Sequence, residues 1–345
     1  MVVAISQGAL INAAHQAFPL QYFVSQRDRE YAPKGFSPAA SALTFFSQTV
    51  APYPYEKLAL IVGATRFGGM ENSSAIVFAN NLFDQRQTDA NAPAGSNNST
   101  SIRFGIPTRM ESVVAHEIAH QWFGDSVTES TWADLWLSEG FATYFAGLFI
   151  EKYDGEAAFR EYMRDAAQRY LNFEKRSRFP IHDTETPNLM NLLNSNNYEK
   201  GAWVLHMLRS QLGDEAFFKG VRDYYDAHKE ANATTEDLRA ALEKSSGKNL
   251  KEFFARWIYG AGHPRYQMSW SVNNAQTELT VTVNQMQEGE AFLDPVPLEL
   301  TIDEKKVPLV FNPESKAATL IVPLKGKLTA TVLDPNETLL KETVK

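Results

Sequence analysis

The 345-residue chain contains no cysteine, which excludes disulfide bonds and thiolate metal sites and leaves the redox compartment open. Any metal must rest on carboxylates and histidines, and the chain has seven histidines. No apolar run reaches the roughly eighteen residues of a membrane span. The first fifteen residues lack the basic start and apolar core of an export signal. We therefore expect a soluble chain without a transmembrane segment, either cytoplasmic or exported after loss of a signal.

Long blocks of like charge are also missing. The 33 basic and 41 acidic residues give a net charge of −8 and are spread along the chain, which argues against a nucleic-acid partner. Hydrophobic residues make up 44% and aromatic residues 12%, enough to bury a sizeable core. A chain of this length is expected to form two or more domains.

One segment concentrates the scarce histidines. His116, Glu117 and His120 form an HExxH pattern, and Glu139 follows after eighteen residues. Residues four apart lie on one face of a helix, so both imidazoles can bind one ion. A catalytic zinc usually takes three protein ligands, and Glu139 is the natural third. Glu117 is expected to act as general base towards the metal-bound water. The pattern predicts one zinc per chain.

The alternative is an ordinary helix that buries one imidazole and exposes the other. The local sequence supports a helix in either case, since Val113, Val114 and Ile118 supply an apolar face and no glycine or proline occurs before Gly124. We therefore expect the helix to run to Gly124. The acidic residue that follows at a suitable distance favours the zinc site over the ordinary helix.

Three motifs in this order resemble the gluzincin zinc aminopeptidases of the aminopeptidase N, or alanyl aminopeptidase, type. Besides the zinc pattern, residues 67–72 read FGGMEN, similar to the family motif G-[AG]-M-E-N, and residues 198–202 read YEKGA, similar to its Y-x-K-G-A segment. The resemblance runs from about Phe36 to Pro264. It implies peptide substrates with a free N-terminus, bound by Gly68, Gly69, Met70, Glu71 and Asn72.

The resemblance also assigns two roles. Glu71 is implied to hold the substrate's protonated α-amine, and Tyr198 is implied to donate a hydrogen bond to the oxyanion. Without the resemblance, Glu71 would be read as a surface carboxylate and Tyr198 as one more aromatic on a core helix. The chain departs from the family at Ser138, where relatives often have Asn, and at Ser73 and Ser74, where many have Trp-Gly.

Residues around the zinc pattern offer partners for the ligand histidines, which usually donate their second nitrogen to a carboxylate or carbonyl. We expect Asp134 or Thr143 to be such a partner. Ser138 is explained equally well as a helix cap. His263, beside a proline in a linker, is expected to be structural.

The expected fold class is α+β. Strands are predicted at residues 20–24, 58–62 and 74–79, which places GGMEN beside a sheet edge, and a serine-capped helix is predicted from Ser37–Pro38 to about Val50. A polar segment from Gln85 to Thr100 is predicted to be a mobile loop. Residues 110–259 are mostly helical in pattern, and residues 265–345 alternate as in an antiparallel β domain.

The resemblance implies a thermolysin-like catalytic domain, a mixed sheet plus a helical half, followed by a small C-terminal β-sandwich. We expect lead-in strands over residues 1–30, the catalytic domain over 31–262 and the β domain over 263–345. Relatives usually carry a large N-terminal β domain, which is expected to be missing here. Three functions remain open: a zinc aminopeptidase, a zinc endopeptidase of the same fold, and a non-catalytic peptide-binding scaffold.

Overall fold

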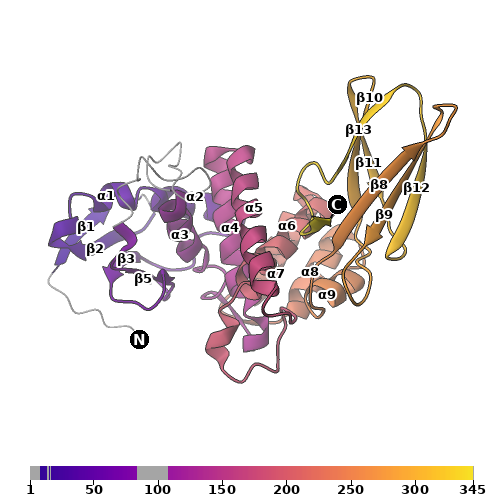
Figure 1. Ribbon diagram of the computed structural model, residues 1–345. Helices are drawn as coiled ribbons and strands as arrows, with labels where there is room; N and C mark the ends of the chain where they lie inside the picture. Colours follow the sequence, from indigo (N-terminus) through magenta and orange to yellow (C-terminus); the bar gives the residue numbers. More distant parts are fainter. Residues whose placement is uncertain (1–7, 14, 16, 84–107, 345) are drawn as a thin grey trace.

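The computed structural model describes residues 8–13, 15, 17–83 and 108–344, and the loop predicted at Gln85 to Thr100 lies outside them. Three regions follow one another along the chain (Figure 1). A sheet with short helices comes first, a group of helices forms the middle, and a β-sandwich comes last. Their buried apolar side chains form one continuous cluster. Among the described residues, no helix has the length and apolar character needed to cross a membrane.

The first region is built on a mixed sheet. Its strands, in spatial order, are β1 (Gly8–Ala13), β2 (Leu20–Ser25), β3 (Leu58–Gly63), β5 (Ala75–Ala79) and β4 (Gly69–Met70). β2, β3 and β5 run parallel, whereas β1 and β4 pair antiparallel with their neighbours. The three predicted strands are confirmed to within one residue. β4 places two residues of the GGMEN motif at an edge of this sheet, as predicted.

Two helices of this region follow β2. α1 spans Ala32–Gly35 and α2 spans Pro38–Thr49, and a 3-10 turn, η1 (Gln26–Asp28), precedes them. Pro38 occupies the first turn of α2, as predicted, but the Ser37 side chain makes no cap hydrogen bond. Ser37 has the helical angles φ −56° and ψ −28°, whereas a capping residue is usually extended. The predicted serine cap is therefore wrong.

The middle region is predominantly helical, as the pattern predicted. Its helices and turns are α3 (Thr108–Ala119), η3 (Trp132–Asp134), α4 (Trp136–Asp154), α5 (Glu156–Glu174), η4 (Leu189–Leu192), η5 (Asn196–Lys200), α6 (Gly201–Leu212), α7 (Asp214–His228), α8 (Thr235–Ser246) and α9 (Lys251–Trp257). Two short parallel strands, β6 (Val127–Glu129) and β7 (Ala231–Ala233), interrupt them. α4 is buried on all sides over residues 136–150, so it forms the centre of this region.

The zinc-pattern helix is shorter than predicted. α3 ends at Ala119. The His120 amide still bonds four residues back to His116, but the amides of Gln121 and Trp122 bond only three residues back, to Ile118 and Ala119. Such bonds tighten the last turn of a helix and end the α-helical pattern. The prediction that the helix continues to Gly124 is therefore wrong, and His120 lies in the turn just after α3.

The last region is a β-sandwich. One sheet has the order β12 (Ala317–Pro323), β9 (Glu278–Gln285), β8 (Arg265–Val272) and β14 (Glu342–Val344), and the other has β11 (Lys305–Phe311), β10 (Val296–Ile302) and β13 (Leu328–Leu333). Alternate residues of β9 and β10 are buried, as expected for strands with one face in a core. The sheets are antiparallel except that β14 runs parallel to β8, so the prediction of a wholly antiparallel domain is wrong there.

Buried polar contacts join the sandwich to the helices. Trp257 Nε1 donates to Asp294 Oδ2 at 2.8 Å. His263 is buried and its Nδ1 contacts Glu174 Oε2, so its surroundings agree with a structural role. The boundaries expected at residues 30 and 262 stay predictions.

Candidate active site

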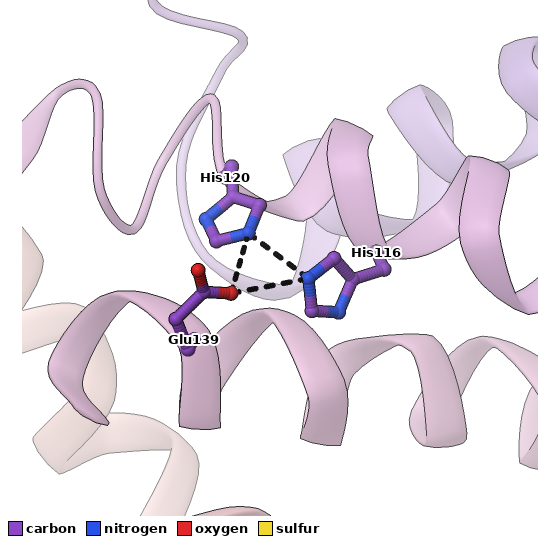
Figure 2. A group of neighbouring side chains, drawn as sticks. All are labelled: His116, His120 and Glu139. Atoms are coloured by element: carbon purple, nitrogen blue, oxygen red, sulfur yellow. Dashed lines mark hydrogen bonds and ion pairs between the residues drawn. The ribbon is translucent and has the colours of Figure 1, made fainter. Parts of the chain in front are cut away.

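Neighbouring segments supply the three predicted metal ligands. His116 lies in the last turn of α3, His120 in the turn after it, and Glu139 in the first turn of α4. Figure 2 shows the three side chains pointing toward one another. The Nε2 atoms of His116 and His120 are 3.0 Å apart, and Glu139 Oε2 lies 3.3 Å and 3.2 Å from them. The packing of α4 against α3 thus brings a carboxylate to the paired imidazoles.

This donor set fits a zinc ion. A tetrahedral zinc with bonds of about 2.0–2.1 Å needs ligand atoms about 3.3 Å apart, close to the distances between these three atoms. Glu139 Oε2 is buried without a hydrogen-bond partner. The two Nε2 atoms face each other, so at least one directs a lone pair inward rather than a proton. A cation between the three atoms would satisfy all of them.

Burial and charge set the protonation of the group. Burial lowers the pKa of His116. Burial acts in the same direction on His120, but the carboxylates of Glu139 and Glu71 outweigh it and raise the pKa of His120 well above its ordinary value. Burial opposes ionisation of Glu139, yet His120 and His116 hold the pKa of this carboxyl far below its usual range. Glu139 is therefore anionic at neutral pH, as a metal ligand must be.

The second nitrogens of the histidines have partners of their own. His120 Nδ1 lies 3.0 Å from the Phe123 carbonyl oxygen and 3.1 Å from Ser138 Oγ. Thr143 Oγ1 lies 3.5 Å from His116 Nδ1, so one of the two expected partners faces a ligand. Such contacts fix the orientation of a ligand imidazole.

The structure decides against Asp134 as a partner of a ligand histidine and against Ser138 as a helix cap. Asp134 instead accepts hydrogen bonds from Thr131 Oγ1 and from the backbone and hydroxyl of Thr235, because η3 turns its side chain toward α8. Ser138 lies inside α4, whose N-cap is Leu135, and is not a cap. Its position directly before Glu139 was the available signal for a role beside the metal group.

Glu117 lies against the edge strand. Its side chain is 6% exposed, and its Oε2 is buried without a hydrogen-bond partner. Burial raises the pKa of Glu117 to about 8, although the neighbouring His120 acts in the opposite direction. A Cβ at Gly69 would lie 2.1 Å from Glu117 Cδ. The absence of a side chain at Gly69 therefore lets the Glu117 carboxyl reach the cleft.

Tyr198 comes from η5, a π-helical turn that precedes α6. Its hydroxyl donates to Glu139 Oε1 at 2.6 Å, and its ring lies parallel to that of His116 at 6.0 Å between centroids. Burial and the Glu139 carboxylate raise the pKa of Tyr198, which keeps the hydroxyl protonated. The structure therefore places Tyr198 in the cleft, and the interpretation as an ordinary core aromatic is wrong.

The GGMEN motif lines the same cleft, which has a volume of about 950 Å³. Gly68, Gly69, Met70 and Glu71 face it, whereas Asn72 does not and donates from Nδ2 to the Met70 carbonyl at 3.3 Å. Ligand atoms of Glu71, Glu117 and His120 lie within 4.8 Å of one another. The GGMEN motif thus places the Glu71 carboxylate beside Glu117 and His120 of the HExxH pattern.

Sequence reasoning missed the charge of the cleft. Its lining includes eight carboxylates and two arginines, Arg109 and Arg169. Glu129, at the end of β6, is the missed carboxylate that interacts electrostatically with Glu71 and Glu139, and burial raises its pKa to about 7. Other missed carboxylates come from the end of α4 and from α5, namely Asp154, Glu161 and Asp165. None lies in a motif, so only the fold brings them together.

Comparison with known proteins confirms the predicted family and fold class. The "Peptidase family M1 domain" model matches residues 36–257. "Probable aminopeptidase 2" of Sulfurisphaera tokodaii is 34% identical over 72% of this chain and 30% of its own length. "Aminopeptidase 2, mitochondrial" of Saccharomyces cerevisiae is 31% identical over 75% of this chain and 27% of its own. The chain therefore spans less than a third of either relative.

A solved structure has the same fold. The crystal structure of Legionella pneumophila aminopeptidase A in complex with aspartic acid superposes with a TM-score of 0.77 at 18% sequence identity, covering 98% of this chain and 38% of that one. The likeness includes the first sheet, the helices and the sandwich, in agreement with the expected architecture. From the family model and the two relatives, we conclude that the chain belongs to peptidase family M1.

Proposed function

We propose that this chain carries the catalytic site of a zinc aminopeptidase, which releases N-terminal residues from peptides. One observation carries the proposal: a single cleft holds the three-ligand group, the free carboxylate oxygen of Glu117 and the Glu71 carboxylate. The relatives above are aminopeptidases by name, which supports the same activity. We also propose that residues 31–262 form the catalytic unit.

His116 Nε2, His120 Nε2 and Glu139 Oε2 would hold one zinc ion. When bound, zinc polarises the scissile carbonyl and lowers the pKa of its water toward about 7. Glu117 acts as the general base. A cation held by the three ligands would favour its ionised form, and its free Oε2 would then take a proton from the attacking water and later give it to the leaving amine.

Glu71 selects the bond that is cut. A carboxylate within 4.8 Å of the Glu117 and His120 ligand atoms can pair with a substrate's α-ammonium, so the first peptide bond falls beside the general base. β4 is the last strand of its sheet among the described residues, and an extended substrate can add to its free side as a further strand. Gly68, Gly69 and Met70 would then contact the substrate backbone, with Asn72 supporting the turn.

Tyr198 is the proposed hydrogen-bond donor to the oxyanion. In the structure its hydroxyl donates to Glu139 Oε1. The role therefore requires the O–H to turn from one anionic acceptor to another as charge develops on the substrate. Its raised pKa supports this role, because the group retains the proton that it must donate.

The test measures zinc content together with hydrolysis of amino-acid p-nitroanilides and of matched peptides with free and acetylated N-termini. We expect one zinc per chain, release from free N-termini alone, and loss of turnover in Glu117→Gln with zinc retained. Glu215→Gln, the same change at an exposed position of α7, is the matched control and should keep full activity.

Other outcomes select the other functions. Cleavage of acetylated peptides at a similar rate would identify an endopeptidase, in which Glu71 does not select the N-terminus. Zinc binding without turnover on any of these substrates, together with peptide binding, would favour the non-catalytic scaffold.

A further inference from the structure

A buried amide follows directly after the second ligand histidine. Gln121 is fully buried, with an exposed fraction of 0%. A primary amide has two N–H donors and an acceptor oxygen with two lone pairs, and leaving them unpaired in a protein interior is costly. Burying the Gln121 side chain therefore costs free energy unless each of these groups has a hydrogen-bond partner.

Both N–H donors and the acceptor oxygen of Gln121 have partners. Two of these partners, Glu71 and Ser74, belong to the turn of residues 71–74, which we call the GGMEN turn. Gln121 Nε2 donates to the Glu71 carbonyl oxygen and to Asp125 Oδ2, both at 2.7 Å. Its Oε1 accepts from the Ser74 backbone amide at 2.7 Å. It also lies 3.2 Å from the Tyr53 hydroxyl, which shares its single proton with the Lys57 carbonyl oxygen at 3.1 Å. One side chain thus spans the turn from Glu71, which carries the proposed ammonium site, to Ser74, the residue just before β5.

The turn needs such support. Ser74 has φ 61°, in the left-handed region that glycine adopts most readily. The Ala75 amide bonds back to the Asn72 carbonyl, and the Ser74 carbonyl accepts from the Ala59 amide in the sheet. The Glu71 carbonyl and the Ser74 amide lie between these sheet and turn bonds, and Gln121 is the partner of both.

We propose that Gln121 is a positioning residue that fixes Glu71 relative to the metal ligands, an inference that rests on the proposed aminopeptidase function. Gln121 is adjacent in sequence to His120, and its side chain holds the backbone of Glu71. Gln121 therefore connects the metal-ligand group to the backbone of Glu71, and this connection sets the distance between the ligands and the substrate's amine. Misplacing the Glu71 carboxylate weakens substrate binding without removing any group that touches the reacting atoms.

Two variants separate this role from simple packing. Gln121→Met keeps the length and approximate volume of the side chain and loses every hydrogen bond. Gln121→Glu keeps the acceptor for Ser74 and Tyr53, but it turns a carboxylate oxygen toward the Glu71 carbonyl and Asp125. Ser74→Gly is the matched control, because it changes the same turn and retains the backbone N–H that Gln121 accepts.

The first readout is steady-state hydrolysis of alanine p-nitroanilide, with zinc content measured in parallel. If Glu71 is misplaced, the substrate's ammonium loses one well-formed polar contact with its carboxylate. We therefore expect KM to rise about tenfold in both Gln121 variants, while kcat changes much less. The preference for free over acetylated peptides should fall as well. Ser74→Gly should keep the wild-type KM. Wild-type KM in both Gln121 variants would overturn the proposal.

The second readout does not depend on catalysis. Hydrogen exchange of the zinc-loaded wild type and Gln121→Met is compared at the Ser74 amide and along α3. We expect faster exchange at residues 71–75 and unchanged protection in α3. Loss of protection throughout α3 with loss of zinc would show that Gln121 only supports the core, and unchanged exchange at Ser74 would also overturn the proposal. An inactive wild type would instead contradict the aminopeptidase function, while the exchange result still decides the role of Gln121.

Discussion

His206 should make the stability of this protein depend strongly on pH below neutrality. It lies on α6, where its Nε2 is 3.2 Å from the Glu337 carbonyl oxygen in the segment after β13. Aromatic rings surround its imidazole, with that of Phe159 at 5.2 Å and that of Trp203 at 5.3 Å between centroids. Burial lowers the pKa of His206 from its ordinary 6.5 to about 4.

The sign and size of the effect follow from this pKa. Because the folded pKa is depressed, the unfolded chain takes up the proton first as the pH falls. The free energy of unfolding contributed by His206 is therefore fully present above pH 6.5 and is lost as the pH falls toward 4. A difference of about 2.5 pH units, at about 1.4 kcal/mol per unit, amounts to about 3.5 kcal/mol in full, of which about 3 kcal/mol is lost between pH 6.5 and 4.

Urea unfolding at pH values from 4 to 7.5 checks this, with metal removed so that zinc binding does not contribute. His206→Gln and His206→Phe both remove the titrating group but differ in polarity and packing. The free energies of unfolding of the two variants are expected to differ from each other. Between pH 6.5 and 4, however, the free energy of unfolding of each variant should fall by about 3 kcal/mol less than that of the wild type. A wild-type pH dependence in both variants would refute the reasoning, because it would mean that His206 is not desolvated in the folded state.

Four further predictions follow from the site and the fold. Tyr198→Phe should lower kcat by about 10²–10³ with little change in KM, measured with zinc content as control, and unchanged kcat would exclude its proposed role. Removal of zinc by EDTA should lower the free energy of unfolding, by about 4 kcal/mol where zinc had been present at a thousand times its Kd. Gly140→Ala should cost about 1–3 kcal/mol in urea unfolding, because its Cβ would lie 3.0 Å from the Gly201 Cα, and no loss would contradict this close packing. Ser74→Gly should raise the free energy of unfolding by about 1 kcal/mol by relieving the left-handed backbone, and a loss of stability would show that the Ser74 side chain contributes more than the strain costs.

The residues that the sequence could place are those with a local pattern. The zinc-pattern helix and the strands of the first sheet carry regular apolar spacing, so their existence and approximate bounds could be predicted. Helix ends were less accurate, because the tightening after Ala119 depends on the contacts of His120 and not on a glycine or proline. The parallel direction of β14 was missed because alternation is the same in either direction.

Parts of the site that depend on tertiary contacts could not be read from the chain. Glu129 reaches the cleft from β6, whose pairing with β7 joins residues about a hundred positions apart. No local pattern singles out Gln121, and only the fold shows that its amide spans the turn from Glu71 to Ser74. The departure at Ser74 was visible in the sequence, but the positive φ that makes it costly was not.

The π-helical turn at η5 makes the site sensitive to the length of the chain as well as to its residues. The amides of Lys200 and Gly201 bond five residues back, to Ser195 and Asn196, so this turn holds one residue more than an α-helical turn. Deleting one residue between 195 and 198 would allow an ordinary α-helical turn. The segment before this turn would then be rotated by about 100° about the helix axis relative to α6. Tyr198 and α6 would keep their sequence, but the segment before the turn would point in a different direction relative to them. We therefore expect a single-codon deletion here to be more harmful than most single substitutions in the same turn.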